Sequence, residues 1–259
     1  NAKFKDLPSG YKALTASQKE EIKNNRFSPS LPQQEPGIRN SCALPYELHV
    51  DGRLTEDRKN FEILLQSKNE LFATQSAGAP FIVYAPGRYA LNDRLNHRRD
   101  YESVRTWNYA VKAGDQIVDK WPVTGFEKEL YHLRVYGPNG FFREFVGNKN
   151  DPAIIISIDY ERMKNNVSEL SGNVLLSLKN VSEHESYTIE TNDSTYKRGV
   201  RSITLEKSSS AIEVFDLAGS FNWYDIIVKV KGNNIFEKKY AGRIETGNHG
   251  KTDPFMGRV

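Results

Sequence analysis

Histidine and cysteine, which often bind metals or act in catalysis, are few and scattered in this chain. Its five histidines, at positions 49, 97, 132, 184 and 249, lie far apart, without the His-x-x-x-His spacing that places two imidazoles on one helix face. The one cysteine, Cys42, excludes an internal disulfide and a thiolate metal cluster. Neither a Gly-x-Ser-x-Gly elbow nor a Gly-rich phosphate loop ending in Lys-Ser or Lys-Thr occurs. We therefore expect no catalytic residue, no metal ligand and no cofactor here.

A basic loop is the most suggestive local cluster. Arg88, Arg94, Arg98 and Arg99 all fall within the polar stretch Pro86–Ser103. Guanidinium groups bind phosphate in a bidentate way, so such a loop can hold lipid head groups at a membrane surface. Two aspartates interleave with the arginines, and a charged insertion is also typical of a solvated loop. Both interpretations stay open.

Phe142 is a second candidate for surface contact. It follows Phe141 directly, and side chains alternate between the two faces of a strand. If Phe141 lies in the core, Phe142 faces outward, where it can insert at a membrane interface or pack against another domain. An ordinary pair of hairpin aromatics is the alternative. The candidate lipid-surface contacts are Arg94, Arg98, Arg99 and Phe142.

Composition excludes two classes of protein. The 36 basic and 33 acidic residues leave a net charge of +3, which is too balanced to argue for nucleic-acid binding. No run approaches the roughly 18 apolar residues of a membrane-spanning helix, and the mean hydropathy is -0.63. The length suits one large domain or two small ones.

The elements that must position these residues are short strands. From residue 44 onward, β-branched and aromatic runs are punctuated by Gly, Pro, Asn and Ser, which is the all-β pattern. Seven strands in about 100 residues is typical of an immunoglobulin-like or fibronectin-like sandwich. We expect strands at 46–50, 61–67, 81–84, 106–112, 116–121, 130–136 and 141–146, and again at 154–159, 173–178, 187–191, 202–206, 212–216, 223–230 and 235–240.

An internal duplication indicates two such sandwiches in succession. Four blocks match in the same order: 63–69 with 174–180, 121–125 with 215–219, 131–135 with 224–228, and 141–147 with 236–242. The polar segment 150–152 separates the two sets. We expect a first β-sandwich repeat at 41–150, a second at 151–250 and a C-terminal tail at 251–259.

Residues 1–40 are expected to form an extended arm. Ser17 and Glu20 have the spacing of a capping box, so a short helix is predicted at 17–24 with Ser17 as its N-cap. Three prolines and a glycine in 28–37 forbid both helix and central strand. Helix is expected only within 11–25 and the Pro86–Ser103 loop.

Several sequence blocks resemble one enzyme family. The blocks are Glu35-Pro-Gly-Ile-Arg39, Ala43-Leu-Pro-Tyr-Glu-Leu-His-Val-Asp-Gly52, Gly78-Ala-Pro-Phe81, Tyr136-Gly-Pro-Asn-Gly-Phe141, Val214-Phe-Asp-Leu-Ala-Gly-Ser220, Trp223-Tyr-Asp225, Ala241-Gly-Arg-Ile-Glu-Thr-Gly247 and Thr252-Asp-Pro-Phe-Met-Gly257. Together they are similar to the C-terminal repeat region of bacterial phosphocholine-preferring phospholipases C. The similarity spans about residues 30–257.

The resemblance implies a function through a larger enzyme. It implies a parent that hydrolyses phosphatidylcholine or sphingomyelin to a lipid alcohol and phosphocholine in an N-terminal phosphoesterase domain. This chain would then be a non-catalytic region that stabilises that domain or orients it at a phospholipid surface, in a secreted or periplasmic protein. A carbohydrate- or adhesin-type binding module is the alternative, because the sandwich fold hosts many functions. Weak esterase activity of the chain itself is a third possibility.

Overall fold

The computed structural model describes residues 9–25, 35–91, 100–193 and 195–256. It divides the chain into two compact units: Asn1–Ile38 with Phe255–Val259, and a body, Arg39–Pro254. In the first unit, helix α1 (Ala16–Asn24) begins earlier than predicted. Thr15, with extended backbone angles, is the N-cap, and it forms a capping box with Gln18. The predicted cap at Ser17 is wrong, because Ser17 already lies inside the helix.

The body is built almost entirely of strands, which confirms the all-β prediction. The first half contains β2 (Leu48–Leu54), β3 (Asn60–Ser67), β4 (Ala79–Ala85), β7 (Arg105–Val111), β8 (Asp115–Pro122), β9 (Tyr131–Tyr136) and β10 (Phe142–Gly147). The second half contains β11 (Ile154–Met163), β12 (Asn166–Asn180), β13 (Tyr187–Asp193), β14 (Gly199–Leu205), β15 (Ser210–Phe215), β16 (Trp223–Val230) and β17 (Glu237–Arg243). Every expected strand has a counterpart among these fourteen.

Smaller elements complete the body. Two ribbons pair β1 (Asn40–Ser41) with β18 (Gly250–Lys251) and β5 (Tyr89–Ala90) with β6 (Tyr101–Glu102). Four 3-10 turns are η1 (Ala73–Gln75), η2 (Val123–Gly125), η3 (Glu127–Glu129) and η4 (Ala218–Ser220). The prediction that confined helix to 11–25 and 86–103 is therefore wrong, since these turns lie where short loops were expected. In the described part of 86–103 the regular structure is the β5–β6 ribbon.

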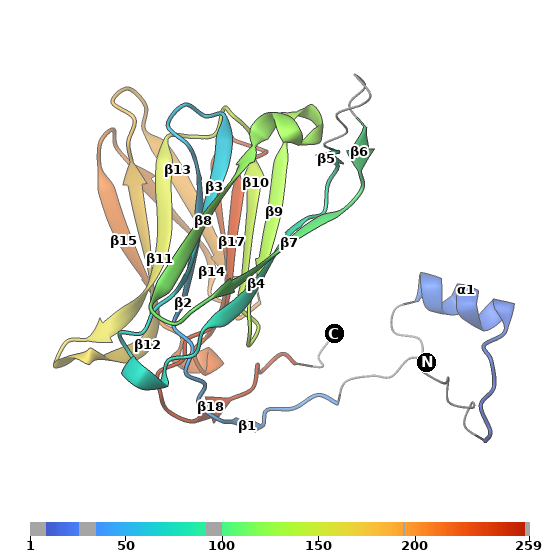
Figure 1. The fold of residues 1–259 in the computed structure, drawn as a ribbon. Helices are drawn as coiled ribbons and strands as arrows, with labels where there is room; N and C mark the ends of the chain where they lie inside the picture. Colours follow the sequence, from blue (N-terminus) through green and yellow to red (C-terminus); the bar gives the residue numbers. More distant parts are fainter. Residues whose placement is uncertain (1–8, 26–34, 92–99, 194, 257–259) are drawn as a thin grey trace. The chain divides into compact units, whose positions relative to one another are not determined.

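The strands stack in two layers (Figure 1). One layer is an eight-stranded antiparallel sheet in the order β14-β13-β16-β17-β10-β9-β4-β7. The other consists of two three-stranded sheets, β2-β3-β8 and β11-β12-β15. The two halves are therefore sandwiches that share one large sheet through the β10–β17 pair. The boundary at 150–152 stays a prediction, and it falls in the connection between β10 and β11.

The two halves are related by a pseudo-two-fold axis between β10 and β17. In that pair Arg143 lies opposite Tyr240, and Phe145 lies opposite Lys238. Because the block 141–147 matches 236–242, each of these pairs is the two-fold image of the other. The β9–β10 turn also has the conformation that its sequence predicts, with positive φ at Asn139 and Gly140.

The hydrophobic core has two parts, one in each half. One buried cluster takes its residues from 48–145 and a second from 154–244, and each fills the space between the two layers of its own half. At the outer end of each half an inward-facing acid joins the layers. Asp119 accepts a hydrogen bond from Tyr109, and Glu213 accepts one from Arg201. Inward-pointing charges of this kind discourage further strand pairing at an open edge.

The two small sheets meet in the middle of the body without joining. We call this line between β2 and β11 the seam. Strand carbonyls along it receive hydrogen bonds from side chains instead of from a neighbouring strand. The donors and acceptors are Tyr160 Oη to Leu48 O (2.7 Å), Arg143 Nε to Val50 O (3.3 Å), Lys238 Nζ to Gly52 O (2.7 Å) and Tyr240 Oη to Ile156 O (3.4 Å). All four donor residues are buried.

The seam predicts a large effect for one substitution. Arg143→Met keeps an unbranched, flexible side chain but removes its hydrogen bonds to three backbone carbonyls and to the Tyr224 hydroxyl. Because these buried acceptors lose their donor, we expect the free energy of unfolding to fall by about 3–5 kcal/mol in urea denaturation. Lys229→Met removes an exposed ion pair and should cost less than about 1 kcal/mol. Equal losses in the two variants would contradict the role of the seam.

Candidate functional site

The basic loop is described only at its base. Arg94, Arg98 and Arg99 lie outside the described residues, so their predicted lipid contact stays a prediction. The base itself is well anchored, because the Tyr89 ring packs edge-on against Trp107 and Phe126, with centroids 5.2 and 5.0 Å away. The loop therefore leaves the body from a fixed stem, the β5–β6 ribbon.

Phe142 lies on the outer face of the eight-stranded sheet. Phe141 is buried and Phe142 is half-buried, which is the alternation expected from their positions. The Phe142 ring packs against Tyr136 at a centroid distance of 5.1 Å, and Ile82 pairs with Tyr136 on the next strand. Ile82 and Tyr136 are 43% and 42% exposed, so these three side chains form an apolar row on the outer face of the sheet. We call it the aromatic row.

The Phe142 side chain and the stem of the basic loop lie at different levels of the sheet. Phe142 follows the β9–β10 turn, which is level with the start of β4 because Ile82 pairs with Tyr136. The basic loop instead connects the end of β4 to the start of β7. The strand register therefore separates the stem of the loop from Phe142.

Paired charges surround the aromatic row. Glu144 accepts hydrogen bonds from Arg134 Nε and pairs with His132 Nε2, both at 2.6 Å. The hydrogen bond from His132, assisted by Arg134, lowers the pKa of Glu144 to about 2. Sequence reasoning missed this cluster, because it depends on the strand register, which places Arg134 opposite Glu144. On the neighbouring strands Lys239 pairs with Asp225 at 3.0 Å. The face is thus charged but locally neutralised.

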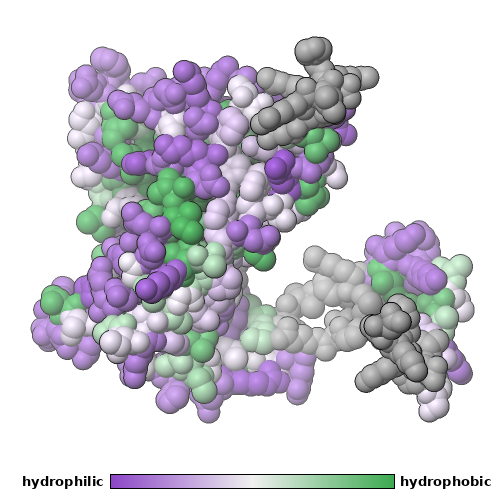
Figure 2. All heavy atoms as spheres, viewed as in Figure 1, coloured by the Kyte–Doolittle hydropathy of each residue, from purple (hydrophilic) through white to green (hydrophobic). Residues whose placement is uncertain are grey.

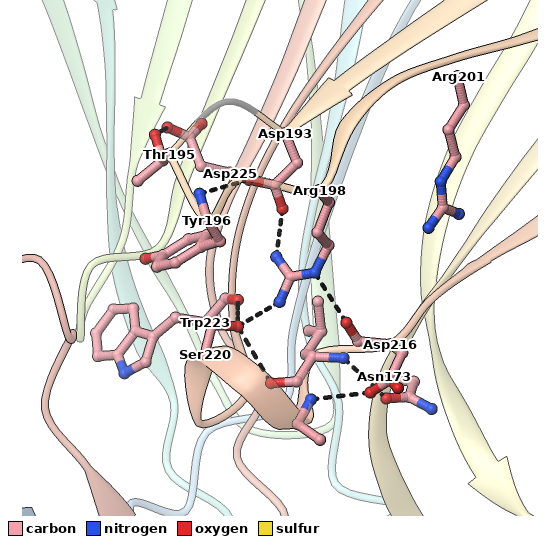
Figure 3. A network of polar contacts seen from close by, with 12 residues as sticks. Asn173, Asp193, Thr195, Tyr196, Arg198, Arg201, Asp216, Ser220, Trp223 and Asp225 are labelled. Atoms are coloured by element: carbon pink, nitrogen blue, oxygen red, sulfur yellow. Dashed lines mark hydrogen bonds and ion pairs between the residues drawn. The ribbon is translucent and has the colours of Figure 1, made fainter.

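A further polar network holds the end of the second half (Figure 3). Arg198 points into it and binds the Asp193 carboxylate, the Asp216 carbonyl (2.8 Å) and the Ser220 hydroxyl (2.5 Å). Ser220 in turn donates to the Trp223 carbonyl at 2.6 Å. These contacts join the β13–β14 connection to η4. The network uses its donors and acceptors internally, which is what a structural clamp requires.

Two of the titratable groups buried at the seam, His49 and Asp51, have pKa values shifted in opposite directions. Burial, followed by the nearby charge of Lys68, lowers the pKa of His49 to about 3, against the attraction of Asp159. Burial raises the pKa of Asp51 to about 7, although Lys238 and Arg143 oppose this. Within the described residues, His49 Nε2 and Asp51 Oδ1 have no hydrogen-bond partner. No sequence pattern marks either residue, because only the contact between the two halves buries them.

Metal-binding clusters and membrane-spanning helices are both absent from the described residues. No three His, Cys, Asp or Glu side chains there come close enough together to hold a metal ion. Within the same residues, no helix combines the length and the apolar character needed to cross a bilayer.

Comparisons with known proteins find related sequences. Residues 40–148 match the family model described as bacterial phospholipase C, C-terminal domain. A non-hemolytic phospholipase C of Pseudomonas aeruginosa is 32% identical over 271 residues, covering 99% of this chain and 34% of that protein. The non-hemolytic phospholipase C of Burkholderia pseudomallei is 31% identical over 88% of this chain and 29% of its own length. The hemolytic phospholipase C of Pseudomonas aeruginosa is 28% identical, with 88% and 31% covered. The chain spans about a third of the length of these relatives.

The two buried seam groups predict opposite pH effects on stability. The pKa of His49 is lower in the folded state than in the unfolded state. Its contribution to the free energy of unfolding is therefore lost as pH falls from about 6.5 towards 3. Asp51 has a higher pKa in the folded state, so its contribution is complete below about 3.8 and is lost as pH rises through about 7. Between pH 4 and 6.5 the two contributions oppose each other.

Single variants should separate these contributions in urea denaturation across a pH series. Relative to wild type, His49→Gln should gain stability as pH falls from 6.5 to 4, by up to roughly 1.4 kcal/mol per pH unit. Asp51→Asn should instead be favoured at pH 7 to 8 and should lose this advantage towards pH 4. Profiles of both variants that run parallel to that of wild type would contradict the burial of these two groups.

Proposed function

We propose that the chain, whose residues 40–148 match the family model of bacterial phospholipase C C-terminal domains, is a non-catalytic accessory region of such an enzyme. Its role would be to stabilise the N-terminal phosphoesterase domain or to orient that domain at a phospholipid surface. The observation that carries the proposal is the match to a C-terminal domain in relatives about three times as long as this chain. The remaining two thirds of such a protein has room for the catalytic domain.

The aromatic row supports a role in contact with another surface. Ile82, Tyr136 and Phe142 offer apolar area, and aromatic side chains are enriched at the centres of protein interfaces. The charges beside them are already paired, so a partner that covers this face leaves few of these charges without a counter-ion. This combination suits a docking face for the phosphoesterase domain better than a site of chemistry.

The properties of the parent enzyme are part of the same proposal. It would hydrolyse phosphatidylcholine or sphingomyelin to phosphocholine and a lipid alcohol, and it would be secreted or periplasmic. The aromatic rings and the sandwich architecture leave a carbohydrate- or adhesin-type module as the second candidate function. Glycan-array binding by the chain, with no effect on the enzyme, would favour that candidate.

The experiment compares the full-length enzyme with a version that ends before this chain. We expect truncation to lower the thermal midpoint of the phosphoesterase domain if the chain stabilises it, with losses on both micellar and vesicle substrates. If the chain orients the enzyme, activity should fall on vesicles but not on short-chain micelles. A truncated enzyme with unchanged stability and unchanged rates on both substrates would refute the proposal.

Liposome co-sedimentation of the chain tests the proposed lipid contacts. The attraction of Arg94, Arg98 and Arg99 to an anionic surface should be roughly 1 kcal/mol per charge and should fade with salt, whose Debye length at physiological ionic strength is about 8 Å. Phe142 should add an apolar contribution that salt does not weaken. The triple Arg→Ala variant should therefore lose the salt-dependent binding, and Phe142→Ala the residual binding at high salt. Equal sedimentation of all three proteins would leave these residues as ordinary surface.

A further inference from the structure

A cleft of about 570 Å³ opens between the two halves at one end of the seam. Its volume lies in the range of small-molecule sites, which often form where domains meet. Apolar side chains from both halves line it: Leu54 and Phe61 from the first, and Ile154, Ile155, Val181 and Phe236 from the second. Ile155 and Val181 are 38% and 45% exposed at its opening. Figure 2 shows a strip of apolar side chains among polar ones on the face where Figure 1 draws β8 and β11 in front.

Several basic side chains of the cleft keep hydrogen-bond donors or positive charge available for an anionic ligand. Arg53 and Lys120 share one carboxylate, that of Glu62, at 3.4 and 3.0 Å. Arg58 uses Nη1 to bind two backbone carbonyls, and among the described residues its Nε and Nη2 have no hydrogen-bond partner. Lys238 lies at the bottom, where its Nζ makes one hydrogen bond, to Gly52 O, out of the three it can donate.

The acids of the cleft are more fully engaged than the cations. Asp151 accepts hydrogen bonds from the Tyr131 hydroxyl and the Asn148 amide, and burial raises its pKa. Glu62 is held between its two cations. Glu56 is the remaining acid, and it lies at the exposed rim. An anion that enters the cleft therefore meets donors at its mouth and at its floor.

The pseudo-two-fold axis supplies an internal comparison. The equivalent place at the other end of the seam holds a cavity of only about 10 Å³. At that end, Tyr160 occupies the position equivalent to Gly52 of the first half. The equivalence follows from strand pairing, because Gly52 pairs with Ile63 and Tyr160 pairs with Val174, the residue that matches Ile63. The same alignment makes Tyr46, six residues before Gly52, equivalent to Ile154, six residues before Tyr160. The same architecture is thus closed by two tyrosines at one end and left open at the other.

A second difference seals the closed end. Arg243 and Glu245 form a buried ion pair at 3.2 Å beside it, and Glu245 also binds the Asn139 side chain (2.5 Å) and the Leu44 amide (3.2 Å). The sandwich can therefore be completed at such a position with side chains from the chain itself. The open cleft is a property of the residues placed there and not of the fold.

We propose that this cleft binds a single-chain amphiphile with an anionic head group. The apolar walls from both halves would take the alkyl chain, and Arg53, Arg58 and Lys120 would hold the head group at the opening. Neither a bare anion nor an uncharged detergent satisfies both parts of the site. The inference goes beyond the proposed function, because the cleft lies within this chain and its ligand is tested on this chain alone.

Three probes separate the two parts of the site. Isothermal titration of the 259-residue chain would use dodecyl phosphate, inorganic phosphate and dodecyl maltoside, with the two amphiphiles kept below their critical micelle concentrations. We expect one molecule of dodecyl phosphate to bind, at least tenfold more tightly than either of the other two, and to raise the thermal midpoint. Binding should weaken with salt but persist, because the apolar contribution is not screened.

Surface variants test the location without disturbing the core. Ile155→Trp should narrow the cleft, and the double variant Arg53→Gln with Lys120→Gln should remove two cations and leave Glu62 to repel the ligand. Each should weaken dodecyl phosphate binding at least tenfold. Ile212→Trp is the matched control on the same small sheet, 66% exposed and outside the cleft, and Lys207→Gln with Lys229→Gln matches the charge change. Both controls should bind as wild type does.

The outcomes that overturn the proposal are specific. Inorganic phosphate binding as tightly as dodecyl phosphate would make the cleft a simple anion site. Dodecyl maltoside binding equally well would remove the role of the cations. Equal losses in the cleft variants and their controls would place the ligand elsewhere on the chain. The thermal midpoint of each variant without ligand, close to that of wild type, shows that the variant is folded.

Discussion

The open backbone edge at the centre of the body is the constraint on which the rest of the structure depends. β2 and β11 face each other across the seam in separate sheets, so their carbonyls find no strand partner there. An unpaired buried carbonyl costs about 1–3 kcal/mol, and side chains from strands of both layers supply the missing donors. Two of these donors are cations, Arg143 and Lys238, which must be buried to reach the carbonyls. Because one comes from each half, neither half can complete the seam alone.

The sequence was sufficient for what depends on local pattern. Runs of β-branched and aromatic residues marked all fourteen long strands. Matched blocks predicted a duplication, and the β10–β17 pair places two of these blocks opposite each other. The contacts between the halves could not be predicted from the sequence. Arg143, Lys238 and His49 look like ordinary polar residues there, and only the tertiary structure buries them. The Arg134–Glu144 pair was missed as well, because the predicted hairpin left its register open. The helix start was misjudged because Thr15 and Ser17 both head plausible capping boxes.

The departures from two-fold symmetry are where function is most readily accommodated. The shared sheet and the seam are symmetric and are explained by the needs of folding. The aromatic row around Phe142, the loop carried by the β5–β6 ribbon and the cleft beside Gly52 each belong to one half or one end only. Packing did not require any of them, as the closed cavity beside Tyr160 illustrates. An accessory region that contacts a neighbouring domain or a lipid would use surfaces of this kind, while the symmetric core keeps them in fixed positions.

The central claim is that the two halves fold as one unit, and differential scanning calorimetry tests it most directly. A shared sheet and a seam completed from both sides should give one cooperative transition for the body, with a calorimetric enthalpy equal to the van't Hoff enthalpy. Two independent sandwiches would instead give two transitions, or a calorimetric enthalpy about twice the van't Hoff value. We expect a ratio near one. A ratio near two, or a resolved second peak, would contradict the account.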